Sequence, residues 1–198
     1  MKMGENVTEY FEFAGVKNTE NTLKYAIERA KLGISDIVVA SSYGETAKML
    51  FDMLEKENLN VNVVVVTYHQ GFSGPDVVAM PENVKKDLEK RGATVFSGTH
   101  ALSGVERGIS KRFGGYGPVE VIAQTLKTLG QGVKVCYEVT VMAADAGLVS
   151  TKKEIIAIGG SSRGADSAVV IRPSNMNTFF DIELRELICM PKNKKKHE

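Results

Sequence analysis

Four consecutive valines, Val63 to Val66, leave one stretch of the chain without a polar side. β-Branched residues favour strands, and successive side chains of a strand point to opposite faces of the sheet. This segment therefore predicts a strand, 61–66, that is covered on both faces, as in a parallel sheet with helices on either side. Ile37, Val38 and Val39 repeat the pattern in a second predicted strand, 34–40.

Strand patterns alternate with helical patterns along the chain, which is the order expected of an α/β protein. Further strands are predicted at 93–96, 154–158, 167–171 and 184–189. Apolar spacing of i, i+3, i+4 and i+7, with proline at the start or glycine at the end, predicts helices over 23–30, 47–54, 81–92 and 118–130. The segment 133–146 fits both a strand and a helix; its end, Ala143 to Gly147, favours a buried helix.

Length and charge limit the remaining possibilities. A chain of 198 residues suits a single domain, expected over 1–190, followed by a basic tail over 191–198. A net charge of +1 argues against a nucleic-acid-binding protein and favours small-molecule partners. There is no signal-like segment and no apolar run of about 20 residues, so we expect a cytoplasmic protein without a membrane partner. Cys136 and Cys189 lie in apolar stretches, where a thiol acts as a small hydrophobe.

Two segments are long enough to be functional loops, 71–80 and 104–117. The second carries Glu106, Arg107, Lys111 and Arg112, and is interpreted either as a mobile basic flap or as a solvated surface loop.

Small and hydroxylated residues follow the predicted strands, and ligands of parallel α/β sheets bind at the carboxyl ends of strands. After the first strand come Ser41, Ser42, Tyr43, Gly44, Glu45 and Thr46, directly before a helix. Free amides and the dipole at such a helix start favour an anion, so this turn is a candidate phosphate cradle. Helix capping by Ser42 or Thr46 explains the same residues equally well.

Three later strands end in comparable groups. Thr67 and His69 follow the second strand, Thr99 and His100 follow the third, and Gly159, Gly160, Ser161, Arg163, Gly164 and Asp166 follow the fourth. Either histidine could bind a phosphate or act as a general acid or base, although a lone loop histidine is more often a surface or packing residue. The arginine offers a planar donor fork for phosphate or carboxylate.

Several familiar sites have no support in the sequence. There is no Walker-type Gly-Lys-Ser/Thr ending, no Gly-x-Gly-x-x-Gly after the first strand, and no ligand spacing typical of a metal site, so no metal is expected. A catalytic triad or a Cys-His pair cannot be read from spacing, and no catalytic residue is assigned.

The segment Ile37 to Thr46 resembles the strand and phosphate-binding turn of the pyruvate kinase carboxy-terminal domain. Four further segments strengthen the likeness: Thr99 to Gly104, Met142 to Gly147, Ala157 to Gly160, and Arg163 to Asp166. Together they resemble a mainly archaeal family of stand-alone proteins with that domain's fold, over nearly the whole chain.

The resemblance implies a three-layer α/β/α sandwich with a mostly parallel sheet, lacking the barrel that carries pyruvate kinase activity. It also implies a homo-oligomer. The effector phosphate turn of the family maps onto Ser41, Ser42, Gly44 and Thr46, whereas Glu45 departs from the pattern by placing a carboxylate beside the turn.

Stand-alone members of the family are linked with flavin mononucleotide (FMN), a ligand that suits the nearby Tyr68, His69 and Phe72. The leading hypothesis is thus a protein that binds a phosphate-bearing small molecule, FMN, with its phosphate at 41–46 and its ring towards His69, His100 and the 159–166 loop. The alternatives are a sensor or regulatory protein for a sugar phosphate, and a flavin-dependent reductase or small transferase. Whether the protein is an enzyme stays open.

Overall fold

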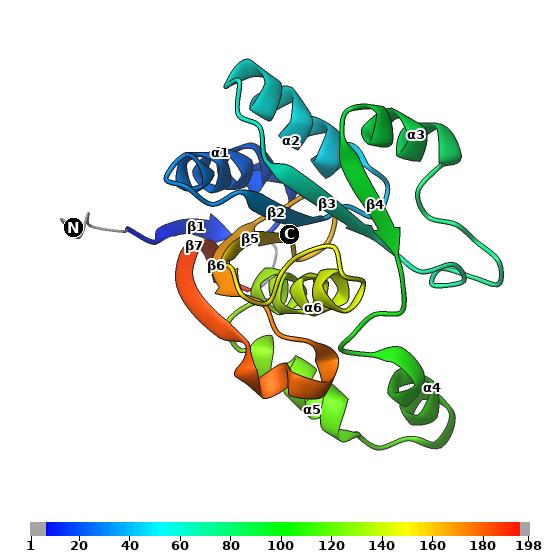
Figure 1. Ribbon diagram of the computed structural model, residues 1–198. Helices are drawn as coiled ribbons and strands as arrows, with labels where there is room; N and C mark the ends of the chain where they lie inside the picture. The colour runs from blue at the N-terminus through cyan, green and yellow to red at the C-terminus, as the bar shows by residue number, and fades with distance from the viewer. Residues whose placement is uncertain (1–6, 195–198) are drawn as a thin grey trace.

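A single seven-stranded sheet organises the computed structural model, which describes residues 7–194 (Figure 1). The strand order is β1-β7-β6-β5-β2-β3-β4. The strands are β1 (Glu9–Phe13), β2 (Asp36–Ala40), β3 (Asn62–Thr67), β4 (Ala93–Ser97), β5 (Ile155–Gly159), β6 (Ser167–Arg172) and β7 (Glu183–Asn193). All pairings are parallel except β5 with β6 and β6 with β7, which confirms the predicted mostly parallel sheet.

Helices cover both faces of this sheet, as Figure 1 shows. They are α1 (Thr19–Ala30), α2 (Glu45–Lys56), α3 (Glu82–Lys90), α4 (Gly104–Phe113), α5 (Pro118–Leu126) and α6 (Gln131–Asp145), with short 3-10 turns at Val16–Asn18 and Met176–Asp181. The first three helices pack on one face and α6 on the other. The predicted α/β/α sandwich is confirmed.

Alternating residues of the strands belong to two hydrophobic cores, one on each face of the sheet. Ile37 and Val39 face α1 and α2, whereas Val38 and Val64 face α6. Both sets are buried, and this accounts for the continuous β-branched runs in the sequence.

The ambiguous segment 133–146 is helical, and it lies hard against the sheet. A Cβ atom added to Gly159 would come within 2.4 Å of the Gly132 carbonyl oxygen, so Gly159 permits α6 to approach β5 closely. A Cβ atom added to Gly132 would come within 2.3 Å of the Ser167 hydroxyl oxygen, at the start of β6. Cys136 on this helix is a buried free thiol, as is Cys189 in β7, and burial raises the pKa of Cys189 to about 12.

The structure differs from the sequence-based expectations at three places. The segment predicted as a loop over 104–117 contains helix α4, which the interruptions by Gly104 and Gly108 obscured. Strand β1 was not predicted, because its side chains are mostly exposed and lack an apolar pattern.

The third difference concerns the carboxyl end of the chain. Strand β7 continues through Asn193, since Pro191 and Asn193 pair with Phe11 and Phe13 of β1. Residues 191–193 of the predicted tail are thus part of the sheet, and 195–198 lie outside the described residues. Within 7–194 no helix has the length and apolar character that a membrane crossing requires.

Candidate functional site

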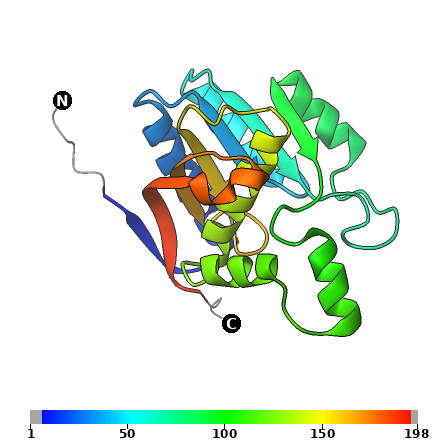
Figure 2. The same cartoon turned by 60° about the horizontal axis from the view of Figure 1, so that its bottom comes forward.

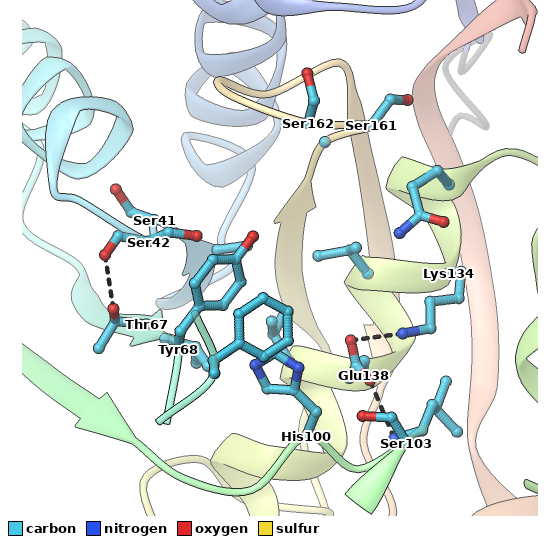
Figure 3. A pocket seen from close by; sticks show the side chains of 18 of the residues that line it. Ser41, Ser42, Thr67, Tyr68, His100, Ser103, Lys134, Glu138, Ser161 and Ser162 are labelled. Atoms are coloured by element: carbon cyan, nitrogen blue, oxygen red, sulfur yellow. Dashed lines mark hydrogen bonds and ion pairs between the residues drawn. The ribbon is translucent and has the colours of Figure 1, made fainter. Parts of the chain in front are cut away.

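A cavity of about 690 Å³ opens where the parallel strands β2 and β3 end, and it reaches across to α5 and α6 (Figure 3). Many predicted site residues line it: Ser41, Ser42, Tyr43, Glu45, Thr46, Thr67, His100, Gly160, Ser161, Arg163 and Gly164. The remaining five, Gly44, His69, Thr99, Gly159 and Asp166, are not part of its lining. The carboxyl ends of the parallel strands therefore do converge, as expected for this class of sheet.

In the turn before α2, different groups serve the two roles that the sequence left open, helix capping and anion binding. The Ser41 hydroxyl accepts a hydrogen bond from the Ala47 amide at 3.2 Å, so Ser41 caps the helix. The Thr67 hydroxyl donates to the Ser42 carbonyl oxygen at 2.8 Å and braces the turn from β3. Neither contact uses the Ser42 hydroxyl.

The backbone of this turn exposes donors. Gly44 has a φ of 98°, and an added Cβ atom would meet Val84 Cγ1 at 2.3 Å, so glycine is required there. Within the described chain, none of the amides from Ser42 to Thr46 donates to a protein acceptor. These amides stand at the positive end of the α2 dipole and can receive an anion.

Arg163 lines the cavity and lies beside this turn. Its guanidinium is 5.3 Å from the centre of the Tyr43 ring and 3.7 Å from Glu45. Both charged side chains are about 70% exposed (71% and 70%), so their mutual attraction is weakened by water. Arg163 nonetheless offsets the negative charge that Glu45 brings to the turn.

The loop that carries Arg163 is shaped by residues that do not reach the cavity. The Asp166 carboxylate accepts hydrogen bonds from the Gly15 amide at 3.0 Å, the Ser161 amide at 3.2 Å and the Ser167 hydroxyl at 3.1 Å. Asp166 is fully buried and holds the loop in place. Asp166 and Gly159 were both predicted to bind the ligand; in the structure they lie outside the cavity lining, and Gly159 packs against α6.

Aromatic rings form one wall of the cavity. Tyr68 and Phe72 stack with centroids 4.1 Å apart, and His100 lies 4.8 Å from Phe72. Burial lowers the pKa of His100, which keeps its imidazole neutral at pH 7. His69 lies 5.3 Å from His100, behind this wall rather than on it. The rings offer a flat apolar surface to a planar ligand.

The part of the cavity lining that lies on α6 carries an ion pair that the sequence did not predict. Lys134 Nζ lies 2.7 Å from Glu138 Oε2, and the two side chains are only 9% and 8% exposed. Glu138 Oε1 also accepts a hydrogen bond from the Leu102 amide at 3.1 Å. Burial lowers the pKa of Lys134, and the charge of Glu138 opposes this effect.

A signal for this pair exists in the sequence. Oppositely charged residues at i and i+4 are usually a surface feature of helices, but these two interrupt a helix that is otherwise almost wholly apolar. Other lining residues that the sequence did not predict are Glu120 and Gln124 on α5, Lys127 directly after α5, and Gln131 at the start of α6. Among residues 7–194, no three His, Cys, Asp or Glu side chains gather closely enough to hold a metal ion.

A comparison with known families bears on this arrangement. The family model described as the pyruvate kinase alpha/beta domain matches residues 20–171, which is most of the chain. The chain belongs to this family. In this member of the pyruvate kinase alpha/beta domain family, every cavity-lining residue lies within the matched range, whereas β1 and β7 lie outside it.

Proposed function

We propose that this protein binds a phosphate-bearing small molecule in the cavity, and that the ligand is FMN. The observation that carries the proposal is the run of unused amides from Ser42 to Thr46, in a turn whose residues other than Gly44 line the same cavity as the stacked rings. An anion cradle and a flat apolar wall in one space suit a ligand that has a phosphate at one end and a planar ring at the other.

The size and charge of the site support the same ligand. A volume of about 690 Å³ lies within the range of roughly 300–1,000 Å³ that is usual for small-molecule sites. Arg163 lies 3.7 Å from the carboxylate of Glu45 beside the turn and partly offsets its charge, which reduces the electrostatic objection to a phosphate there. The amides would hold the phosphate, and Tyr68, Phe72 and His100 would pack against the ring.

The catalytic part of the proposal is secondary. Bound FMN would supply hydride-transfer chemistry, and His100 is the histidine on the cavity wall that could donate or accept a proton. A sensor or regulatory protein would use the same cavity without turnover. Bleaching of the flavin by a substrate would distinguish a reductase from a sensor.

The test of binding is a titration of the purified protein with FMN, followed by flavin fluorescence, with riboflavin as the matched ligand that lacks the phosphate. We expect FMN to bind more tightly than riboflavin. Ser42→Ala should weaken FMN binding by about 1–3 kcal/mol if its hydroxyl contacts the phosphate.

Ser41→Ala is the matched control, because the Ser41 hydroxyl caps α2. It should lower thermal stability more than it lowers affinity. A protein that takes up neither FMN nor a sugar phosphate would contradict the proposal.

We also propose that the protein forms a homo-oligomer, as the resemblance to the pyruvate kinase domain suggests. Light scattering coupled to size exclusion will show whether the mass is a multiple of the 21.5 kDa chain.

A further inference from the structure

We infer that Lys134, held in place by Glu138, selects the ring end of the ligand by donating hydrogen bonds to a carbonyl oxygen or ring nitrogen. This inference rests on the proposed function, because it concerns the same cavity. It names the ligand class more closely: a phosphate ester that carries a planar heterocycle with acceptor atoms at its edge.

The two ends of the cavity are chemically different. Figure 3 shows Ser41 and Ser42 on one side, Lys134 and Glu138 on the other, and Tyr68 and His100 between them. A ligand anchored by a phosphate at the turn would lay its ring along the aromatic wall. The far edge of that ring would then reach α6.

Lys134 has donors to spare. An ammonium group carries three N–H donors. Within residues 7–194 its one polar partner is Glu138, at 2.7 Å. The side chain is only 9% exposed and lines the cavity. Buried donors normally have acceptors, so we infer that a bound ligand supplies the acceptor for the remaining N–H groups.

Within the protein, Lys134 supplies the charge that pairs with the buried carboxylate of Glu138. Glu138 also binds the Leu102 amide and so holds the segment after β4 against α6. Lys134, by contrast, has no other hydrogen-bond or ion-pair partner among residues 7–194. Burying an ion pair costs desolvation free energy, and apolar residues in its place are often neutral or stabilising. Its position in a cavity wall therefore favours a role in ligand recognition.

The electrostatic surroundings fit a hydrogen-bond donor. Burial, Lys127 and Arg107 lower the pKa of Lys134, while Glu138 raises it. A lysine whose pKa is lowered donates its proton more readily to an acceptor. The amide side chains of Gln124 and Gln131 line the same end and can pair with the rest of a heterocycle edge.

The test compares three probes by calorimetry: FMN, ribose phosphate and inorganic phosphate. Lys134→Met keeps most of the side-chain length and removes the donor. We expect it to weaken FMN binding about 10- to 100-fold, from the worth of a hydrogen bond to a charged group, and to leave binding of the two probes without a planar heterocycle unchanged. Ser42→Ala should weaken all three.

Two further variants serve as a replacement for a Lys134 variant that does not fold and as a control outside the cavity. If Lys134→Met does not fold because Glu138 is left unpaired, the double variant Lys134→Met, Glu138→Gln removes both charges and keeps an acceptor for Leu102. Lys152→Met changes an exposed lysine outside the cavity and should alter nothing.

The outcomes separate the two proposals. An equal loss for all three probes would make the pair structural and overturn the inference, as would unchanged FMN binding. The inference would also be overturned if the unmodified protein bound ribose phosphate and inorganic phosphate but did not bind FMN. That result would leave the phosphate site in place. If none of the probes binds, the proposed function itself fails.

Discussion

The two sides of the cavity are built in different ways. On the sheet side, the strands β3 and β5 are buried along almost their whole length, and their residues belong to continuous apolar cores. On the other side, α4 has no buried residue and α5 has only Ala123. Figure 2 shows the two helices, in green and yellow-green, at the edge of the molecule. One wall is thus part of the hydrophobic core, whereas the other is a helical hairpin on the surface.

Polar contacts join the two helices of this hairpin. Glu106 Oε2 accepts a hydrogen bond from the Glu120 amide at 2.7 Å and so caps α5. Glu120 Oε1 accepts one from the Ser110 hydroxyl at 2.7 Å. Elements with few buried apolar contacts open locally at a lower free-energy cost than the core. A ligand in the cavity would therefore lie between a rigid wall and one that can open.

The largest expected effect is in the core. Ile156→Ala removes a fully buried side chain in β5 and should lower the free energy of unfolding by about 2–5 kcal/mol. The matched hairpin variant, Phe113→Ala, changes a side chain that is 80% exposed and should stay within about 0.5 kcal/mol. Urea denaturation measures both. Equal losses would show that the hairpin is as strongly packed as the sheet.

Two glycine substitutions should change the stability of the protein in opposite directions. Gly159→Ala places a methyl group against the Gly132 carbonyl oxygen and should destabilise the protein by about 1–3 kcal/mol. Gly108→Ala lies within α4 with open space around it, and should stabilise that helix by up to about 1 kcal/mol. Thermal unfolding reports both shifts. A destabilised Gly108→Ala variant would mean that α4 is more closely packed than the structure shows.

Removing the cap between α4 and α5 should act locally. Glu106→Ala leaves the Glu120 amide without its acceptor, at a cost of about 1 kcal/mol. Hydrogen exchange should accelerate in α5 and remain unchanged in β3 and β5. Glu106→Gln keeps an acceptor oxygen and should exchange more slowly than the alanine variant. Faster exchange throughout the sheet would show that the hairpin and core open together.

The smallest effect concerns pH. Burial places the pKa of His100 in the folded protein below the ordinary value of 6.5, so the unfolded chain takes up this proton first on acidification. The contribution of His100 to stability should be complete above pH 6.5 and should diminish as the pH falls below it. The free energy of unfolding, measured from pH 7.5 to 5.5, should vary less in His100→Gln than in the unmodified protein. Identical pH profiles would contradict a buried neutral imidazole.

Some parts of the site were readable from the sequence and others were not. The turn 41–46 follows a strand whose pattern is local, so its place at the cavity could be predicted. Which serine of this turn caps α2 could not be predicted, because the choice between Ser41 and Ser42 depends on where the Ala47 amide lies. The role of Asp166 could not be predicted either, because one of its hydrogen-bond partners is Gly15, which is remote in sequence.

The sequence by itself determined the α/β class, the order of most strands and helices, and the edge of the sheet at which small polar residues collect. These properties follow from β-branched runs, helical spacing and turn residues, each of which acts over a few neighbouring positions. Only the tertiary structure decided that β6 runs antiparallel to its neighbours and that Lys134 and Glu138 face the turn across the cavity. Those features depend on which distant segments pack together, because burial and pairing arise from contacts that no local pattern encodes.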